Sequence, residues 1–177
     1  MAIQNLMWGL GQPIAGMIAD RYGTGRVLAA GGLLYALGIY GMAHASTPGM
    51  FHITGGFMVG LGMSGASFSL VLAALGRMVS EERRNLVFGV CTAAGSLGQF
   101  FLVPIGQAFL AAYGWPTALM LLALMVAMII PLSTAMRGRP VAQPGAAKQS
   151  MGQALTEARQ HSGYIYLTAG FFVCGFH

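Results

Sequence analysis

A short charged stretch at residues 16–27 holds the side chains best suited to reversible electrostatic contacts. Asp20 and Arg21 are adjacent, Arg26 follows shortly after, and long apolar runs flank the stretch on both sides. A carboxylate at a helix end can accept hydrogen bonds from the exposed amides of a facing helix N-terminus, which stabilises the contact by roughly 0.3 to 1 kcal/mol. These residues could therefore hold two helix ends together. The simpler alternative is that the charges only end helices and fix their orientation.

Glycines frame these charges. Gly16 lies one helical turn before Asp20, where the missing side chain is expected to let another helix approach closely. Gly23 and Gly25 follow the charged pair and are expected to permit a tight reversal between two helices.

Two acidic residues elsewhere in the chain are candidate partners for the basic residues of this stretch. Glu81 and Glu82 lie at the end of a later apolar run and could pair with Arg21 or Arg26. The neighbouring Arg83 and Arg84 compete for the same carboxylates, so the pairing and its absence are equally compatible with the sequence.

Polar side chains inside the apolar runs are the candidates for a solute path. Ser64 and Ser67 share a face of one run, and Ser96 and Gln99 share a face of the next. A buried amide needs hydrogen-bonding partners, which a water-filled path supplies and lipid does not. The alternative for the serines is plain helix packing, because small residues are the usual packing surface in lipid. His177 is a further candidate for the path.

Side chains suited to enzymatic or metal chemistry are scarce. Residues 62–65 match the Gly-x-Ser-Gly of rhomboid proteases, but the two following runs contain no histidine to take the serine's proton. His44 and His52 flank a turn without nearby Cys, Asp or Glu, so a metal site there is not expected. We therefore predict no catalytic residue, no metal and no cofactor, and keep a rhomboid-like protease only as a remote alternative.

The composition indicates a membrane protein. Of 177 residues, 56% are hydrophobic and 7% are charged, against about 25% charged in an ordinary soluble domain. The mean hydropathy is +0.68. The net charge of +5 is scattered among hydrophobic runs and forms no basic face, which argues against nucleic acid as a partner. The expected fold is an all-α, polytopic helical bundle whose first partner is the lipid bilayer.

The spacing of the apolar runs predicts five complete membrane spans. They cover residues 2–19, 27–45, 51–76, 86–112 and 116–136, and each has the roughly twenty residues that a hydrocarbon core about 30 Å thick requires. A sixth run begins near Gly163 and stops at His177, so it is expected to be a truncated span.

The distribution of basic residues predicts the orientation of these spans. All nine Lys and Arg residues fall in three connections, at 20–26, 77–85 and 137–162, whereas the turns at 44–50 and 113–115 carry no charged residue. By the positive-inside rule the three basic loops are cytoplasmic. The first run would then begin outside the cell, so a preceding helix is expected to be missing.

The pattern of Gly16, three residues, Asp20, Arg21, one residue and Gly23 resembles the loop between the second and third membrane helices of the major facilitator superfamily. Six helices, a long cytoplasmic connection and six more helices are the layout of that family. The resemblance therefore implies a partial major facilitator fold. Residues 1–136 would be the N-terminal half without its first helix, 137–162 the cytoplasmic loop between the halves, and 163–177 the truncated start of the C-terminal half.

This resemblance also implies a function. Members of the family carry out secondary active or facilitative transport by alternating access, and the charged cluster latches the two halves on the cytoplasmic side. Residues 60–65 and 171–177 look like bacterial monocarboxylate-type members, which implies a small organic anion as solute, a coupling proton as a further candidate, and the bacterial inner membrane as location. The remaining helices of the same transporter would be partners. The alternative is a polytopic scaffold without transport activity.

Overall fold

The computed structural model describes residues 2–136 together with Gln160, Gly163 and Tyr166. The chain divides into two compact units, Met1–Pro140 and Val141–His177, and the fold below is that of the first unit. Every element in the described part of the chain is a helix, which confirms the all-α prediction. The loop expected at 137–162 and the truncated span expected at 163–177 lie outside the described residues, apart from the three single positions named above.

The first two helices meet at a sharp turn. Helix α1 covers Ala2–Tyr22 and α2 covers Thr24–Ala43. Gly23 joins them with φ of 94°, a conformation that glycine adopts without steric cost. Its N–H donates a hydrogen bond of 2.8 Å to the carbonyl of Ala19. The predicted reversal is confirmed at Gly23, whereas Gly25 lies inside α2 and takes no part in the turn.

The next span is a helix in four pieces. It consists of α3 (Pro48–Phe51), the π-helical η1 (His52–Met58), α4 (Val59–Gly65) and α5 (Phe68–Met78). The Thr47 hydroxyl begins it by accepting a 3.2 Å hydrogen bond from the amide of Met50. Between α4 and α5 the extended backbone of Ser67 interrupts the helix. The apolar run expected at 51–76 is therefore helical but broken near its middle.

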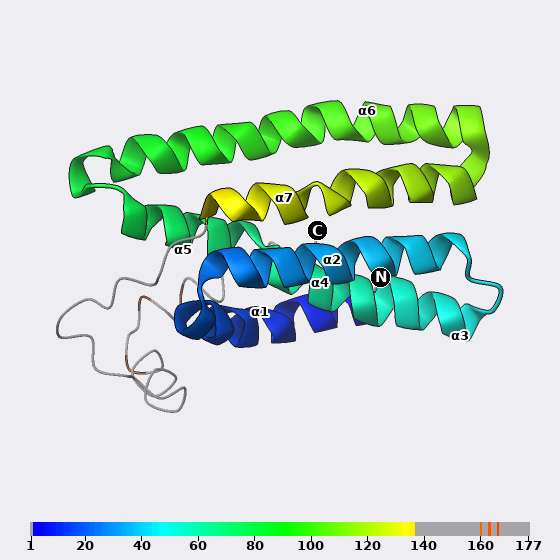
Figure 1. Ribbon diagram of the computed structural model, residues 1–177, viewed down its shortest axis with the longest axis horizontal. Helices are drawn as coiled ribbons and strands as arrows, with labels where there is room; N and C mark the ends of the chain where they lie inside the picture. The colour runs from blue at the N-terminus through cyan, green and yellow to red at the C-terminus, as the bar shows by residue number, and fades with distance from the viewer. Residues whose placement is uncertain (1, 137–159, 161–162, 164–165, 167–177) are drawn as a thin grey trace. The chain divides into compact units, whose positions relative to one another are not determined.

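The last span folds back on itself. Helix α6 covers Glu81–Ala127 and is followed by α7 (Ile129–Ser133) and the 3₁₀ turn η2 (Thr134–Met136). Gly114, with φ of 74° and ψ of 168°, divides α6 into two antiparallel arms, as Figure 1 shows at the far end of α6. This confirms the turn predicted at 113–115.

Three helical segments are long and apolar enough to cross a membrane: Thr24–Ala43, Pro48–Met78 and Glu81–Met136. The third of them contains the reversal at Gly114. Helix α1 is not one of the three, although it has 21 residues, and its Gln4, Asn5 and Gln12 account for its lower hydropathy. The crossing predicted over residues 2–19 therefore stays a prediction.

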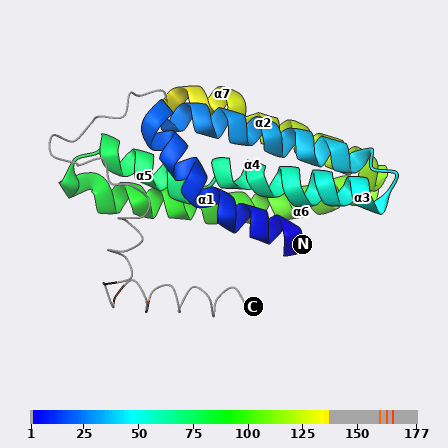
Figure 2. The same cartoon turned by 90° about the horizontal axis from the view of Figure 1, so that it is seen from below.

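The connections of this unit gather at two opposite ends (Figure 1). The turn between α1 and α2, the connection between α5 and α6, and the end of α7 share one end. The turn between α2 and α3 and the reversal at Gly114 share the other. In Figure 2, α1 runs obliquely across α4 toward the start of α2. The basic connections of the described residues therefore lie together.

Glycines allow the backbones of α2 and α4 to touch. A Cβ atom built on Gly31 would stand 2.5 Å from the carbonyl carbon of Gly65. One built on Gly62 would stand 2.5 Å from the backbone nitrogen of Tyr35. Helices in lipid associate by such close packing of small residues, because lipid provides no hydrophobic driving force between them. This crossing holds α2 and α4 in a fixed register.

Candidate functional site

Three helix ends meet around one ion pair, which we call the Asp20 corner (Asp20, Thr24 and Arg77). The Arg77 guanidinium lies in the last turn of α5, and its Nη1 donates to Asp20 Oδ1 at the end of α1 over 2.8 Å. Its Nη2 donates to the Thr24 hydroxyl at the start of α2 over 3.3 Å. The side chains of Arg77 and Asp20 are 37% and 66% exposed, so the corner lies at the surface of the unit.

Arg77 is the residue of this corner that sequence reasoning missed. The sequence suggested Glu81 or Glu82 as partners for the basic residues of the motif, but the only ion pair among the described residues joins Asp20 to Arg77. The sequence alone predicts for Arg77 only a place in a basic connection on the cytoplasmic side. Its place in the last turn of a helix, where a cation is stabilised by the helix dipole, was the signal that could have drawn attention to it.

The two arginines of the motif, Arg21 and Arg26, take no part in this corner. The Arg21 guanidinium lies over the ring of Tyr22, with its central carbon 5.5 Å from the ring centroid. Arg26 is exposed on the first turn of α2. The structure does not bring either arginine together with Glu81 or Glu82 in an ion pair within the described residues, and the role of these four in a latch stays a prediction.

Two glycines of the motif, Gly16 and Gly25, do not act as the sequence suggested. Among the described residues, no atom other than those of its own helix turn lies within 4 Å of the position that a Cβ on Gly16 would take, so no helix approaches there. The packed face of α1 runs through Gly11, Ala15 and Ala19, four residues apart, and Gly16 lies beside it. The close approach falls at Gly25, where a Cβ would stand 2.8 Å from the carbonyl oxygen of Ser133.

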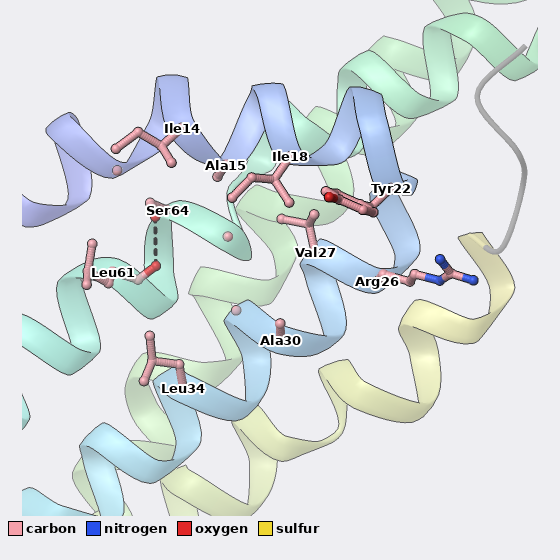
Figure 3. A pocket seen from close by; sticks show the side chains of 13 residues that line it. Ile14, Ala15, Ile18, Tyr22, Arg26, Val27, Ala30, Leu34, Leu61 and Ser64 are labelled. Atoms are coloured by element: carbon pink, nitrogen blue, oxygen red, sulfur yellow. Dashed lines mark hydrogen bonds between the residues drawn. The ribbon is translucent and has the colours of Figure 1, made fainter. Parts of the chain in front are cut away.

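A groove of about 290 Å³ opens between α1, α2 and α4, and we call it the α1/α2/α4 groove. Figure 3 shows Tyr22 and Arg26 at one end of it, with Leu34, Leu61 and Ser64 toward the other. Ser64 is the predicted path residue that lines it. Its hydroxyl donates to the carbonyl of Leu61 over 2.7 Å, so it is already satisfied within its own helix.

The remaining candidates for the solute path are dispersed. Ser67 is buried at the break between α4 and α5, with its hydroxyl 3.1 Å from that of Ser69. Ser96 and Gln99 are exposed on the first arm of α6. His177 lies outside the described residues. The described helices therefore do not join these side chains into one path, and the path stays a prediction.

Comparison with known proteins identifies the chain's relatives. The family model described as Major Facilitator Superfamily matches residues 1–176. Monocarboxylate transporter 11 of Mus musculus is 29% identical over 174 residues, which cover 91% of this chain and 38% of that protein. Monocarboxylate transporter 3 of Mus musculus is 32% identical over 110 residues, which cover 62% of this chain and 22% of that protein. Monocarboxylate transporter 1 of Bos taurus is 28% identical over 117 residues, which cover 66% of this chain and 23% of that protein.

These matches bear on the predicted family, on the prediction that the chain is not an enzyme, and on its predicted location. The chain spans well under half the length of each of these relatives. The family and the relatives are transporters, which confirms that the chain is not an enzyme. The relatives named here are mammalian, so the predicted bacterial inner membrane stays a prediction. A family model that covers nearly the whole sequence, together with helices that can cross a membrane, gives one conclusion. The chain belongs to the Major Facilitator Superfamily.

Proposed function

We propose that the protein moves a small organic anion, a monocarboxylate, across a membrane by alternating access. The observation that carries this proposal is the family match over residues 1–176 combined with relatives that are named monocarboxylate transporters. In transporters of this kind the solute site lies near the middle of the membrane, between two helical halves that rock about it.

The carboxylate of such a solute needs a positive partner or a proton. The five arginines among the described residues, Arg21, Arg26, Arg77, Arg83 and Arg84, all lie in or beside the connections that gather at one end of the unit. We therefore expect the positive partner of the solute carboxylate to come from residues outside those that the structure describes. Cotransport of a proton would balance the charge of the carboxylate and belongs to the same proposal.

The Asp20 corner is the proposed conformational latch. It ties the ends of α1, α2 and α5 together at the end of the unit that carries the basic connections. The positive-inside rule assigns that end to the cytoplasm. A corner of this kind can present its helix ends as one surface, which another part of the transporter binds in one conformation and releases in the other.

The test is uptake of labelled lactate by vesicles that contain the complete protein. Saturable uptake that rises with an inward proton gradient is the expected result. Asp20→Asn keeps the size of the side chain and removes its charge, and a loss of about 1.4 kcal/mol from one conformation shifts the two-state ratio about tenfold. Uptake should therefore fall while insertion and expression stay at parental levels.

The matched control is Glu157→Gln, which removes a charge of the same sign from a residue with no proposed partner. It should transport at the parental rate. Absence of saturable uptake by the parent protein would support the scaffold alternative instead. Parental uptake by the Asp20→Asn variant would leave transport standing and would refute the latch.

A further inference from the structure

The wall of the α1/α2/α4 groove offers almost only apolar surface. Ile14 and Ile18 of α1 face it and are 50% and 44% exposed, and Leu34 and Leu61 line it from α2 and α4. Figure 3 shows these side chains on both sides of the opening. The Ser64 hydroxyl is bonded to its own helix, and the other hydroxyl of the lining, that of Tyr22, lies at the end of the groove near Arg26 (Figure 3). The groove therefore suits a hydrocarbon chain rather than a polar solute.

One end of the groove is positively charged. Arg26 lines that end, and it forms no ion pair within the part of the chain that the structure describes. Tyr22 lines it as well and carries the Arg21 guanidinium over its ring. The nearest carboxylate along the chain, Asp20, is bonded to Arg77. The guanidinium groups of Arg21 and Arg26 thus lie at or beside this end of the groove. The neighbouring Asp20 carboxylate is paired with Arg77 and does not neutralise them.

The length of the groove matches one leaflet of a bilayer. It follows α1 from Gly11 to Tyr22, which spans about 16 Å at the rise of an α-helix. A hydrocarbon core about 30 Å thick gives each leaflet about half of that depth. The charged end lies beside the turn at Gly23, where α1 ends, so a molecule in the groove would have its apolar part in the leaflet and its polar part at the surface.

We propose that the α1/α2/α4 groove binds an anionic phospholipid, with an acyl chain along Ile14, Ile18 and Leu34 and the headgroup phosphate at Arg26. Charge complementarity selects this occupant, because basic groups between membrane helices at a cytoplasmic surface attract anionic headgroups. Long basic side chains reach the interface from within the membrane, as this position requires. The site goes beyond transport and does not depend on the solute.

The test measures lipid retained by the complete protein purified in detergent. The protein is given equal amounts of phosphatidylglycerol and phosphatidylcholine, and native mass spectrometry counts the bound molecules. The parent should retain phosphatidylglycerol in preference. Arg26→Gln should lower that retention about fivefold, which corresponds to about 1 kcal/mol for one basic residue at the membrane surface. Arg26→Lys should retain most of it.

Two further variants make the result specific. Ala30 is exposed and lines the groove, so Ala30→Phe should fill it and reduce the retention of both lipids. Arg83 is exposed at the same end of the unit but does not line the groove, so Arg83→Gln should leave retention unchanged. The proposal is overturned if the parent retains no lipid, which would indicate that another protein segment fills the groove. It is also overturned if Arg26→Gln or Ala30→Phe binds phosphatidylglycerol like the parent, or if the parent does not prefer it.

Discussion

Arg77 reaches two helices at once from the end of a third. The planar guanidinium group presents its donors as a fork, so that one side chain can serve the Asp20 carboxylate and the Thr24 hydroxyl together. An exposed ion pair in water contributes only about 0 to 1 kcal/mol. The value of this residue therefore lies in fixing the position of three helix ends, more than in raising the stability of the fold.

A double-mutant cycle measures how strongly these helix ends are coupled. Asp20→Asn and Arg77→Gln, made singly and together, should show a coupling of about 0.2 to 1 kcal/mol in the free energy of unfolding in detergent, because both side chains are partly exposed. The same cycle with Glu82→Gln in place of Asp20→Asn should be additive. Full additivity of the Asp20 cycle would show that this ion pair does not couple the helix ends.

The sequence indicated half of this corner. Asp20 was identified because a carboxylate beside a basic residue at a helix end is an informative local pattern. Arg77 could not be paired with it, because its position depends on the π-helical turn of η1 and on the break at Ser67, which together set the phase of α5 relative to α1. Neither feature follows from hydrophobic spacing.

At the scale of helices, contact between backbones replaces the interlocking of large side chains. Gly31 of α2 lies against Gly65 of α4, and Gly60 of α4 lies against α1, where a Cβ would stand 2.6 Å from the carbonyl oxygen of Gln4. Backbone atoms cannot turn aside as side chains can, so a methyl group at these positions must separate the helices. Substitutions here should act on the whole crossing.

We predict that Gly31→Ala destabilises the protein by about 1 to 3 kcal/mol, the usual cost of inserting a group into a filled interior. The matched control is Gly9→Ala in α1, where no atom of another described element lies within 4 Å of the new methyl group. It should leave stability unchanged or raise it slightly, because alanine favours a helix more than glycine does. Thermal unfolding in detergent measures both, and equal melting temperatures would contradict the crossing.

Glycine content predicted close packing of helices but not its location. Gly16 was identified by its spacing from Asp20, yet the face of α1 that packs passes through Gly11. A membrane helix with small residues on several faces does not reveal from its own sequence which face meets a neighbour. The apolar runs themselves were predicted well, because their length and their uncharged turns depend only on local sequence.

The first unit as a whole has two chemically different ends. The turn at Gly23, the connection between α5 and α6, and the end of α7 lie at one end with the described arginines, and the turn after α2 and the reversal at Gly114 lie at the other (Figure 1). Such a division between opposite ends is what the positive-inside rule produces in a protein with several spans. The two ends should therefore face opposite sides of the membrane.

Labelling of single cysteines tests this orientation. Ser46 in the turn before α3 and Ser80 at the start of α6 are both exposed, and Ser80 forms no side-chain hydrogen bond at the helix start. In a protein whose own Cys91 and Cys174 are replaced by alanine, Ser46→Cys should react with an impermeant thiol reagent outside intact cells. Ser80→Cys should react only after the membrane is opened. The reverse pattern would invert the assignment of sides.

The contact of Gly25 with the carbonyl oxygens of Ser133 and Met136 sets an order of events during synthesis. The start of α2 leaves the ribosome early, whereas η2 emerges only after α1 to α7 have been made. Contacts between such distant segments form late, because a long loop must close before they can contribute. The first turn of α2 should therefore remain accessible to trypsin at Arg26 in stalled chains that end at Ala127, and become protected in chains that extend well past Met136.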